Sequence, residues 1–175
     1  MRWLVDGYNV IRRDPELRGR EADSLESGRR ALVHLIARAR RALEDEFTVV
    51  FDGALIGGAT PTAGRIRVVF SRPPQTADDE LISLARRSGS GAVVVSSDRK
   101  VQDAARRAGT AVLSAEQFVE ALEAREGGPA DPHTADPQLK DEGDEHAARK
   151  KRGNPRRLSK KARKAQRALG RLRRP

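Results

Sequence analysis

Short apolar runs alternate with longer segments of helical periodicity through about the first 125 residues of the chain. The runs are rich in β-branched or aromatic residues and end at Gly, Pro or a polar turn residue, which predicts strands at 3–5, 47–51, 66–70, 92–96 and 110–113. A run such as AVVVS is apolar throughout instead of alternating, as expected of a strand buried on both faces. The pattern therefore predicts an α/β fold of three layers, with helices on both faces of a mostly parallel sheet.

Four helices are predicted between and after these strands. The first runs from about Leu25 to Glu44 behind an N-cap at Asp23 or Ser24, and its apolar stripe consists of Leu25, Leu32, Leu35, Ile36, Ala39 and Leu43. The others lie in TADDELISLARR, SSDRKVQDAARRAG and SAEQFVEALEA. Capping-box spacing relates Thr76 to Asp79 and Ser114 to Gln117, which marks the starts of two of these helices.

The face of the first predicted helix opposite its apolar stripe is charged and carries Arg30, His34, Arg38 and Arg41. A solvated surface is the simplest explanation for such a face, although its arginines could also flank a path for RNA. His34 has no acid or second histidine at ligand spacing, so no metal site is predicted there.

The composition changes after about residue 125, which predicts one domain followed by two further segments. Residues 126–145 form an acidic segment dense in Pro and Gly that reads as a linker, because it can bury too little apolar surface to fold. Residues 146–175 hold 14 of the 35 Lys and Arg and no acid, whereas the first 145 residues hold 21 Lys and Arg against 25 Asp and Glu. The basic tail is thus predicted to be disordered, or helical over Lys160 to Leu172 on a partner.

Such a tail suits attraction to the phosphates of RNA or of the ribosome, without sequence readout because it has no aromatic residue for stacking. A solubilising tail with no specific partner is the alternative. If the tail only binds, deleting residues 146–175 should weaken RNA binding and spare the chemistry. The predicted RNA contacts in the tail are Lys150, Lys151, Arg152, Arg156, Arg157, Lys160 and Lys161.

The sequence has no cysteine, which excludes disulfides, thiolate zinc sites and cysteine nucleophiles and fits a reducing cytoplasm. Asp6 and Gly7 interrupt the first apolar stretch before it could serve as a signal peptide. No later window has the apolar length of a membrane span. The expectation is a soluble, cytoplasmic protein that does not bind membranes.

Acidic residues follow the predicted strands at equivalent positions. Asp6 and Asp52 end the first two strands, Asp98 follows the fourth, and Asp78 and Asp79 open a helix. Strand ends and the following helix N-termini face one crevice in an open parallel sheet, so these acids should converge. Clustered carboxylates repel one another unless a cation intervenes, and Mg²⁺ or Mn²⁺ prefers such ligands and can activate water toward a phosphodiester.

Each of these acids also has an ordinary structural explanation, because Asp is common in turns and helix caps. The capping box accounts for Asp79 without a metal, so it ranks lowest as a ligand. Asn9 could orient a ligand carboxylate or satisfy the turn after Gly7. Ser96 and Ser97 could contact water at a metal or cap the next helix.

Four motifs resemble one known family in their order and spacing: VDGYNVI at 5–11, VVFDG at 49–53, TADDELI at 76–82 and SSDRKVQ at 96–102. They are similar to the YacP-like branch of NYN domains, relatives of the PIN nucleases, over about residues 1–123. The resemblance implies a Rossmann-like sheet with an endoribonuclease site that uses Mg²⁺ or Mn²⁺, and some members act on messenger RNA at the ribosome. By position it implies catalytic metal ligands at Asp6, Asp52, Asp78 and Asp98, with Asn9 close by.

Two other function classes remain open. One is a noncatalytic RNA- or ribosome-binding protein, against which the retained acids count. The other is a Rossmann-like phosphatase or nucleotide-binding protein. An aspartyl phosphatase needs a second acid two residues after the first, where Tyr8 stands, and no GxGxxG or Walker loop occurs.

Overall fold

A parallel sheet of five strands forms the centre of the computed structural model, which describes residues 1–39, 45–53, 65–124 and 159–173. The strands lie in the order β3-β2-β1-β4-β5. Their bounds are β1 (Arg2–Asp6), β2 (Glu46–Phe51), β3 (Ile66–Phe70), β4 (Ala92–Val95) and β5 (Ala111–Leu113). Every adjacent pair is parallel, and all five predicted strands overlap these, so the predicted α/β sheet is confirmed.

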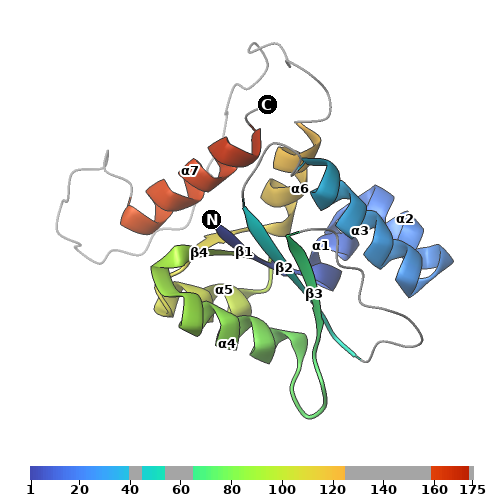
Figure 1. Cartoon of the computed structure of the whole chain (residues 1–175), viewed down its shortest axis with the longest axis horizontal. Coiled ribbons are helices and arrows are strands. Elements are labelled where there is room, and N and C mark those ends of the chain that lie inside the picture. The colour runs from blue at the N-terminus through green and yellow to red at the C-terminus, as the bar shows by residue number, and fades with distance from the viewer. Residues whose placement is uncertain (40–44, 54–64, 125–158, 174–175) are drawn as a thin grey trace, which may run out of the picture.

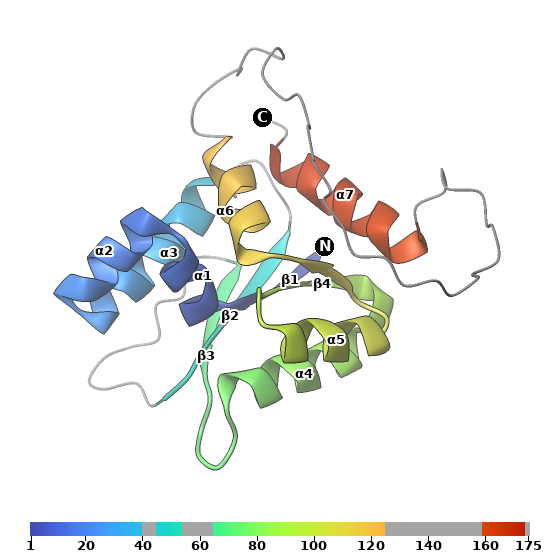
Figure 2. The same cartoon turned by 180° about the vertical axis from the view of Figure 1, so that it is seen from behind.

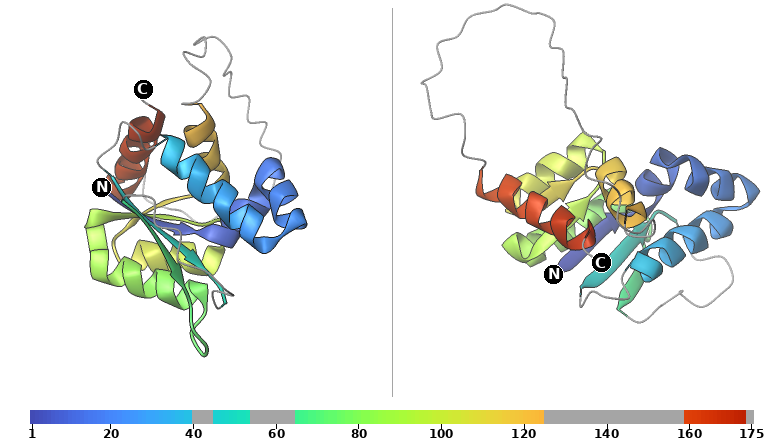
Figure 3. Two further views of the ribbon diagram at one scale, coloured as in Figure 1. Left: turned by 45° about the vertical axis from the view of Figure 1, so that its right-hand side comes forward. Right: turned by 90° about the horizontal axis from the view of Figure 1, so that it is seen from above.

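Helices cover both faces of the sheet and complete three layers (Figure 1). They are α1 (Gly7–Arg13), α2 (Pro15–Asp23), α3 (Leu25–Ala39), α4 (Ala77–Ser88), α5 (Arg99–Arg107), α6 (Ala115–Glu123) and α7 (Lys160–Arg173), with a 3₁₀ turn at Gly89–Gly91. In Figures 2 and 3, α4 and α5 lie on one face and α1, α3, α6 and α7 on the other. None of the helices described is long and apolar enough to cross a membrane.

The alternation of side chains along each strand supplies both layers of the core. In β1, Trp3 and Val5 join the core under α1, α3, α6 and α7, while Leu4 joins the core under α4 and α5. All three are at most 3% exposed. This two-sided burial explains why the strands read as continuous apolar runs in the sequence.

Two helices between β1 and α3 were not predicted, namely α1 and α2. Asp6 caps α1 by accepting from the backbone N–H of Asn9 at 3.2 Å, and Asp14 caps α2 by accepting from that of Leu17 at 2.7 Å. A turn at Asp6 and Gly7, the structural alternative, is therefore wrong, because Gly7 is the first residue of a helix. A Cβ at Gly7 would collide with the Phe51 ring, so glycine allows α1 to approach β2 closely.

The predicted starts of the remaining helices are confirmed. Ser24 precedes α3 and accepts from the backbone N–H of Ser27 at 3.0 Å, and both predicted capping boxes are present. Residues 40–44, including Leu43 and Arg41, lie outside the described residues. Leu25 is wrong as a member of the buried stripe, because it is 52% exposed, while Val33 is buried.

The end of the chain corrects the prediction of a disordered or partner-dependent tail, because α7 packs on the domain itself. Ala168 and Leu172 are fully buried in the same core as Trp3. Arg171 donates to Asp45 at 2.9 Å, which ties α7 to the residue before β2. The buried side chains of this helix therefore pack on its own domain and not on a separate partner. Residues 125–158, which contain the predicted linker and the rest of the tail, lie outside the described residues.

Replacing Leu172 should measure how much α7 contributes to stability. The Leu172→Ala variant should lose about 2–5 kcal/mol of unfolding free energy, because a fully buried leucine leaves a cavity. Leu25→Ala is the matched control and should change that free energy by less than about 0.5 kcal/mol, because Leu25 is largely exposed. Urea unfolding of the full chain measures both, and equal losses would contradict the docking of α7.

Candidate active site

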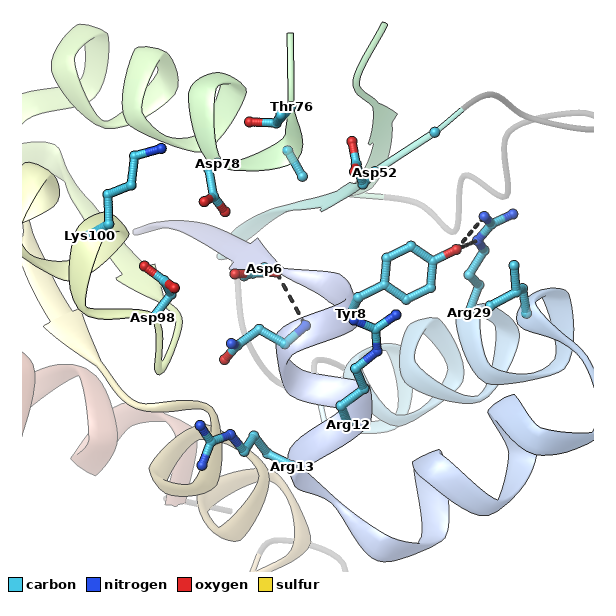
Figure 4. A pocket seen from close by; sticks show the side chains of 14 residues that line it. Asp6, Tyr8, Arg12, Arg13, Arg29, Asp52, Thr76, Asp78, Asp98 and Lys100 are labelled. Atoms are coloured by element: carbon cyan, nitrogen blue, oxygen red, sulfur yellow. Dashed lines mark hydrogen bonds between the residues drawn. The ribbon is translucent and has the colours of Figure 1, made fainter. Parts of the chain in front are cut away.

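A cleft of about 840 Å³ opens at the carboxyl edge of the sheet, and all four predicted acids line it (Figure 4). Asp6 ends β1, Asp52 follows β2, Asp98 follows β4 and Asp78 lies in the first turn of α4. β1 pairs with both β2 and β4, so the direction of winding reverses at β1, where α/β folds commonly bind ligands. Asn9 lines the same cleft, as the resemblance implied. The predicted convergence is observed for these four acids but not for Asp79, which is not among the lining residues.

Asp6 is the most enclosed of the four acids and is held by two neutral donors. Its Oδ1 accepts from the backbone N–H of Asn9, and its Oδ2 accepts from the hydroxyl of Ser96 at 2.9 Å. The Ser96 hydroxyl oxygen accepts in turn from the backbone N–H of Asp98 at 3.1 Å. The Asn9 side-chain oxygen accepts from the backbone N–H of Ser97 at 2.7 Å. The loops after β1 and β4 are thereby fixed to each other.

The other acids have their own supports. Ser71, just after β3, donates to Asp52 at 2.6 Å, and Asp98 caps α5 by accepting from the backbone N–H of Val101 at 3.1 Å. Ser96 and Ser97 therefore do not cap α5. Ser97 instead donates to Glu116 at 2.7 Å, which joins this loop to α6.

The acids of the cleft repel one another. Burial raises the pKa of Asp6 despite the hydrogen bonds from Ser96 and Asn9, and the charges of Asp78 and Asp98 raise it further. Burial also raises the pKa of Asp78, as do Asp98, Asp79 and Asp52, while Lys100 opposes them. No three histidine or acidic side chains in the described part of the chain form a ready-made metal site. The cleft is thus lined by carboxylates whose mutual repulsion is not fully compensated.

Asp79 differs from its neighbour Asp78, as the capping box predicts. It accepts from the backbone N–H of Thr76 at 3.1 Å, and hydrogen bonds from Thr76 lower the pKa of Asp79. Its carboxylate is engaged at the start of α4, and Asp79 is not among the residues that line the cleft.

One side of the cleft is basic and aromatic, and sequence reasoning missed it. Tyr8, Arg12 and Arg13 of α1 and Arg29 of α3 line it, and Lys100 lines the acidic side near Asp78 (Figure 4). Predicting α1 would have revealed this side, because a helix that starts at Gly7 places Tyr8 and Arg12, four residues apart, on one face. Since the sequence pattern did not predict that helix, Tyr8 counted only as an argument against a phosphatase.

The four predicted RNA contacts that the structure describes do not lie in this cleft. Arg30 and Arg38 line a separate groove with His34, and Arg30 pairs with Glu26. Lys160 and Lys161 begin α7, where Lys161 donates to the backbone carbonyl of Arg106. The other candidates, Arg41, Lys150, Lys151, Arg152, Arg156 and Arg157, lie outside the described residues.

The pH dependence of stability should distinguish Asp78 from Asp79 in metal-free buffer. Since the folded state raises the pKa of Asp78, the folded chain binds more protons than the unfolded chain in the window above the ordinary carboxyl pKa, and stability falls as the pH rises through it. The Asp78→Asn variant should therefore be more stable than the parent near pH 7 and lose that advantage toward about pH 3.

Asp79→Asn is the matched control, and its effect on stability near pH 7 should have the opposite sign. Since the folded state lowers the pKa of Asp79, its contribution is present above the ordinary carboxyl pKa and is lost as the pH falls. This variant should be less stable than the parent near pH 7, with the difference shrinking in acid. Urea unfolding across the pH range measures both variants, and shifts of the same sign would contradict the distinction between the two acids.

Comparison with known proteins identifies the family. Residues 3–169 match the YacP-like NYN domain, so the match extends into α7, beyond the predicted limit near residue 123. Uncharacterized protein YacP of Bacillus subtilis (strain 168) is 35% identical over 85 residues, which are 47% of this chain and 50% of the relative; the chain thus matches about half the length of that relative. Crystal structures of Rae1 (YacP) from Bacillus subtilis and of a point mutant of that protein have TM-scores of 0.60 and 0.58 and identities of 32% and 31%. Each superposition covers 71% of this chain, and 76% and 77% of the respective structures. The chain belongs to the YacP-like NYN domain family and has its PIN-like nuclease fold.

Proposed function

We propose that the protein is a metal-dependent endoribonuclease that hydrolyses phosphodiester bonds of RNA with Mg²⁺ or Mn²⁺. The observation that carries the proposal is the convergence of Asp6, Asp52, Asp78 and Asp98 on one cleft at the carboxyl edge of the sheet. The family and its nuclease fold support this choice over a noncatalytic RNA-binding protein.

The chemistry of the donors fits a hard divalent cation. The described residues that line the cleft offer carboxylate oxygens and no thiolate or imidazole, a donor set that suits Mg²⁺ or Mn²⁺. The pKa of both Asp6 and Asp78 is raised in part by neighbouring acids, and a bound cation would relieve that repulsion. Such an ion supplies a water of lowered pKa and neutralises charge on the phosphate.

The protein side chains would orient the reacting groups. Ser96 and Ser71 hold one oxygen each of Asp6 and Asp52, which fixes both carboxylates relative to the sheet. Asn9 binds the backbone of Ser97 and so acts as a positioning residue between the two loops. In hydrolysis the water oxygen bonds to phosphorus while the bridging P–O bond breaks. The water gives up one proton and the departing sugar oxygen takes one up, so the products are a phosphate monoester and a hydroxyl group. Lys100 lines the cleft, and its charge acts on Asp78, so it could stabilise charge on a phosphate bound there.

The basic end of the chain would hold RNA, or the RNA of the ribosome, by attraction to phosphates. Three of its cations already bind the domain, since Lys161 and Lys164 donate to backbone carbonyls and Arg171 pairs with Asp45. We therefore assign RNA attraction chiefly to Lys150, Lys151, Arg152, Arg156 and Arg157, with Lys160, which is exposed at the start of α7. Deletion of residues 146–175 is no longer a clean test, because it removes part of the core.

Cleavage of an unstructured RNA should require both a divalent ion and the clustered acids. Asp6→Asn and Asp78→Asn should each lower the rate at least about a hundredfold, because ligands and their supports commonly matter that much. Asp79→Asn is the control next in sequence and should stay within about tenfold of the parent, because Asp79 does not line the cleft. Gel analysis of labelled RNA with Mg²⁺, Mn²⁺ or EDTA measures the cleavage rate of all three variants. Undiminished cleavage in EDTA or in Asp78→Asn would eliminate the metal mechanism, and RNA binding without any cleavage would favour the noncatalytic alternative.

Neutralising the five cations at 150, 151, 152, 156 and 157 with glutamine should weaken RNA binding and reduce its salt dependence. If all five contact phosphates of a single strand, the slope of log K against log salt should fall by up to about 3.5. The rate of cleavage at saturating short RNA should not change, because the acids that line the cleft are left intact. Fluorescence anisotropy from 50 to 200 mM salt gives the slope, and ribosome sedimentation over the same range tests that partner. An unchanged slope would assign RNA binding to the domain instead.

A further inference from the structure

The basic side of the cleft holds one arginine in an unusually fixed position. The Arg29 guanidinium lies 5.0 Å from the centroid of the Phe70 ring, 5.4 Å from that of Tyr8 and 5.6 Å from that of Phe51. Both its Nε, at 2.9 Å, and its Nη2 donate to the Tyr8 hydroxyl oxygen. A guanidinium held in this way loses little further freedom when it binds a ligand.

Two further arginines at this side are held only weakly. The Cζ of Arg12 lies 5.3 Å from the Tyr8 ring centroid, and its Nε lies 3.6 Å from Oε1 of Glu21. The Nη1 of Arg13 lies 3.3 Å from Oε1 of Glu116. Both arginine side chains are more than half exposed. The Arg13–Glu116 pair is exposed on both sides, so it contributes little and can be exchanged for a phosphate at small cost. Glu21 is largely buried, so Arg12 would bind a phosphate while keeping its ion pair.

An exposed apolar side chain adjoins the same group. Leu25 is 52% exposed, and no other large hydrophobic residue in the described ranges is classed as exposed. It lies four residues before Arg29 in α3, so the two share one face of that helix, and both line the cleft. The surface thus combines an aromatic ring, planar cations and an apolar side chain.

This combination fits one nucleotide of a single strand. Unpaired RNA bases stack on aromatic side chains or guanidinium planes, and arginine binds the adjoining phosphate. A base within a duplex is already stacked and cannot lie on such a surface. The carboxylates occupy the other part of the cleft (Figure 4), where the phosphate that is cleaved would bind.

We propose that Tyr8, Arg12, Arg29 and Leu25 form a subsite for the nucleotide next to the scissile phosphate, which selects single-stranded RNA. The assignment of a neighbouring scissile phosphate rests on the proposed nuclease function, whereas binding of a nucleotide here does not. Arg29 is a binding and positioning residue and takes no part in the chemistry.

The test uses the fact that Tyr8 is the single tyrosine of the chain. Full-length protein labelled with 3-fluorotyrosine gives one ¹⁹F signal, which reports on the subsite directly. It is titrated in EDTA with a short unstructured RNA and, separately, with the same strand annealed to its complement. The signal should move on saturation with the single strand and respond much more weakly to the duplex.

Variants then locate the contact. Arg29→Met should weaken binding of the single strand roughly five- to 150-fold, the range expected for losing one stacked base. Arg67→Met is the comparison, because Arg67 is an exposed arginine of β3 that lines a separate groove and is not a predicted RNA contact, and it should stay within about twofold. In cleavage assays with metal, Arg29→Met should raise KM much more than it lowers kcat. Thermal unfolding checks that the variant is folded, and the titration of the parent protein needs no substitution.

A ¹⁹F signal that stays fixed at saturating single strand, an equal response to the duplex, or an equal loss in Arg29→Met and Arg67→Met would overturn the subsite. These outcomes are separate from failure of the nuclease proposal. If the signal moves but no RNA is cleaved with Mg²⁺ or Mn²⁺, the subsite stands and the nuclease function falls. If RNA is cleaved while the signal stays fixed, the reverse holds.

Discussion

The fold depends on how two buried carboxylates, at opposite edges of one sheet, are neutralised. At the amino edge, Asp45 is fully buried and accepts from the Met1 amino group, the Trp3 indole and Arg171. Burial acts to raise the pKa of Asp45, but these donors and charges lower it overall. Loss of any of these partners would leave the buried charge less compensated, which is strongly destabilising, so Asp45 holds the start of β1, the start of β2 and α7 together.

At the carboxyl edge the balance is reversed. Asp6 is 8% exposed, and its hydrogen-bond donors among the described residues, Ser96 and the backbone of Asn9, are neutral, so burial and the nearby acids raise its pKa. The sheet therefore places a charge-compensated carboxylate at one edge and a set of carboxylates with incomplete charge compensation at the other. Such repulsion lowers the stability of the fold, and the contacts at the amino edge and the two cores offset it. Uncompensated charge of this kind indicates a binding site more clearly than burial alone.

Capping and metal binding are compatible in this site, although the sequence presents them as competing explanations. Asp6 caps α1 and Asp98 caps α5, each through Oδ1. An ionised carboxylate has about four lone-pair positions, so one hydrogen bond to a helix N-terminus leaves capacity for a cation. The cap also fixes the side chain, which reduces the entropy lost on binding. The structural role of these aspartates thus prepares them for the proposed one.

The strands, the capping boxes and the convergence of the acids could be predicted because each depends on local sequence or on the general geometry of parallel sheets. The helix α2 could also have been found, since Asp14 followed by Pro15 is a typical helix start. By contrast, the role of Asp45 depends on Arg171, 126 residues later, and no local pattern reveals such a pair. The burial of Ala168 and Leu172 was missed for the same reason, because a basic, alanine-rich segment has too few large apolar residues to indicate that it packs on its own domain.

The position of α7 limits how the basic end of the chain can assist catalysis. Lys164 donates to the carbonyl of Ala92, the first residue of β4, so α7, on its face of the sheet, reaches the amino edge opposite the cleft. The two edges are separated by the length of a strand, roughly 15 Å for five residues. RNA attracted to α7 and RNA bound among the carboxylates must therefore be different parts of a partner. Basic residues beside α7 would raise the local concentration of RNA without shaping the active site. Substitutions of exposed cations can then change RNA affinity without changing the cleavage rate. Loss of α7 would disturb both, because α7 shares a core with the domain that carries the active site.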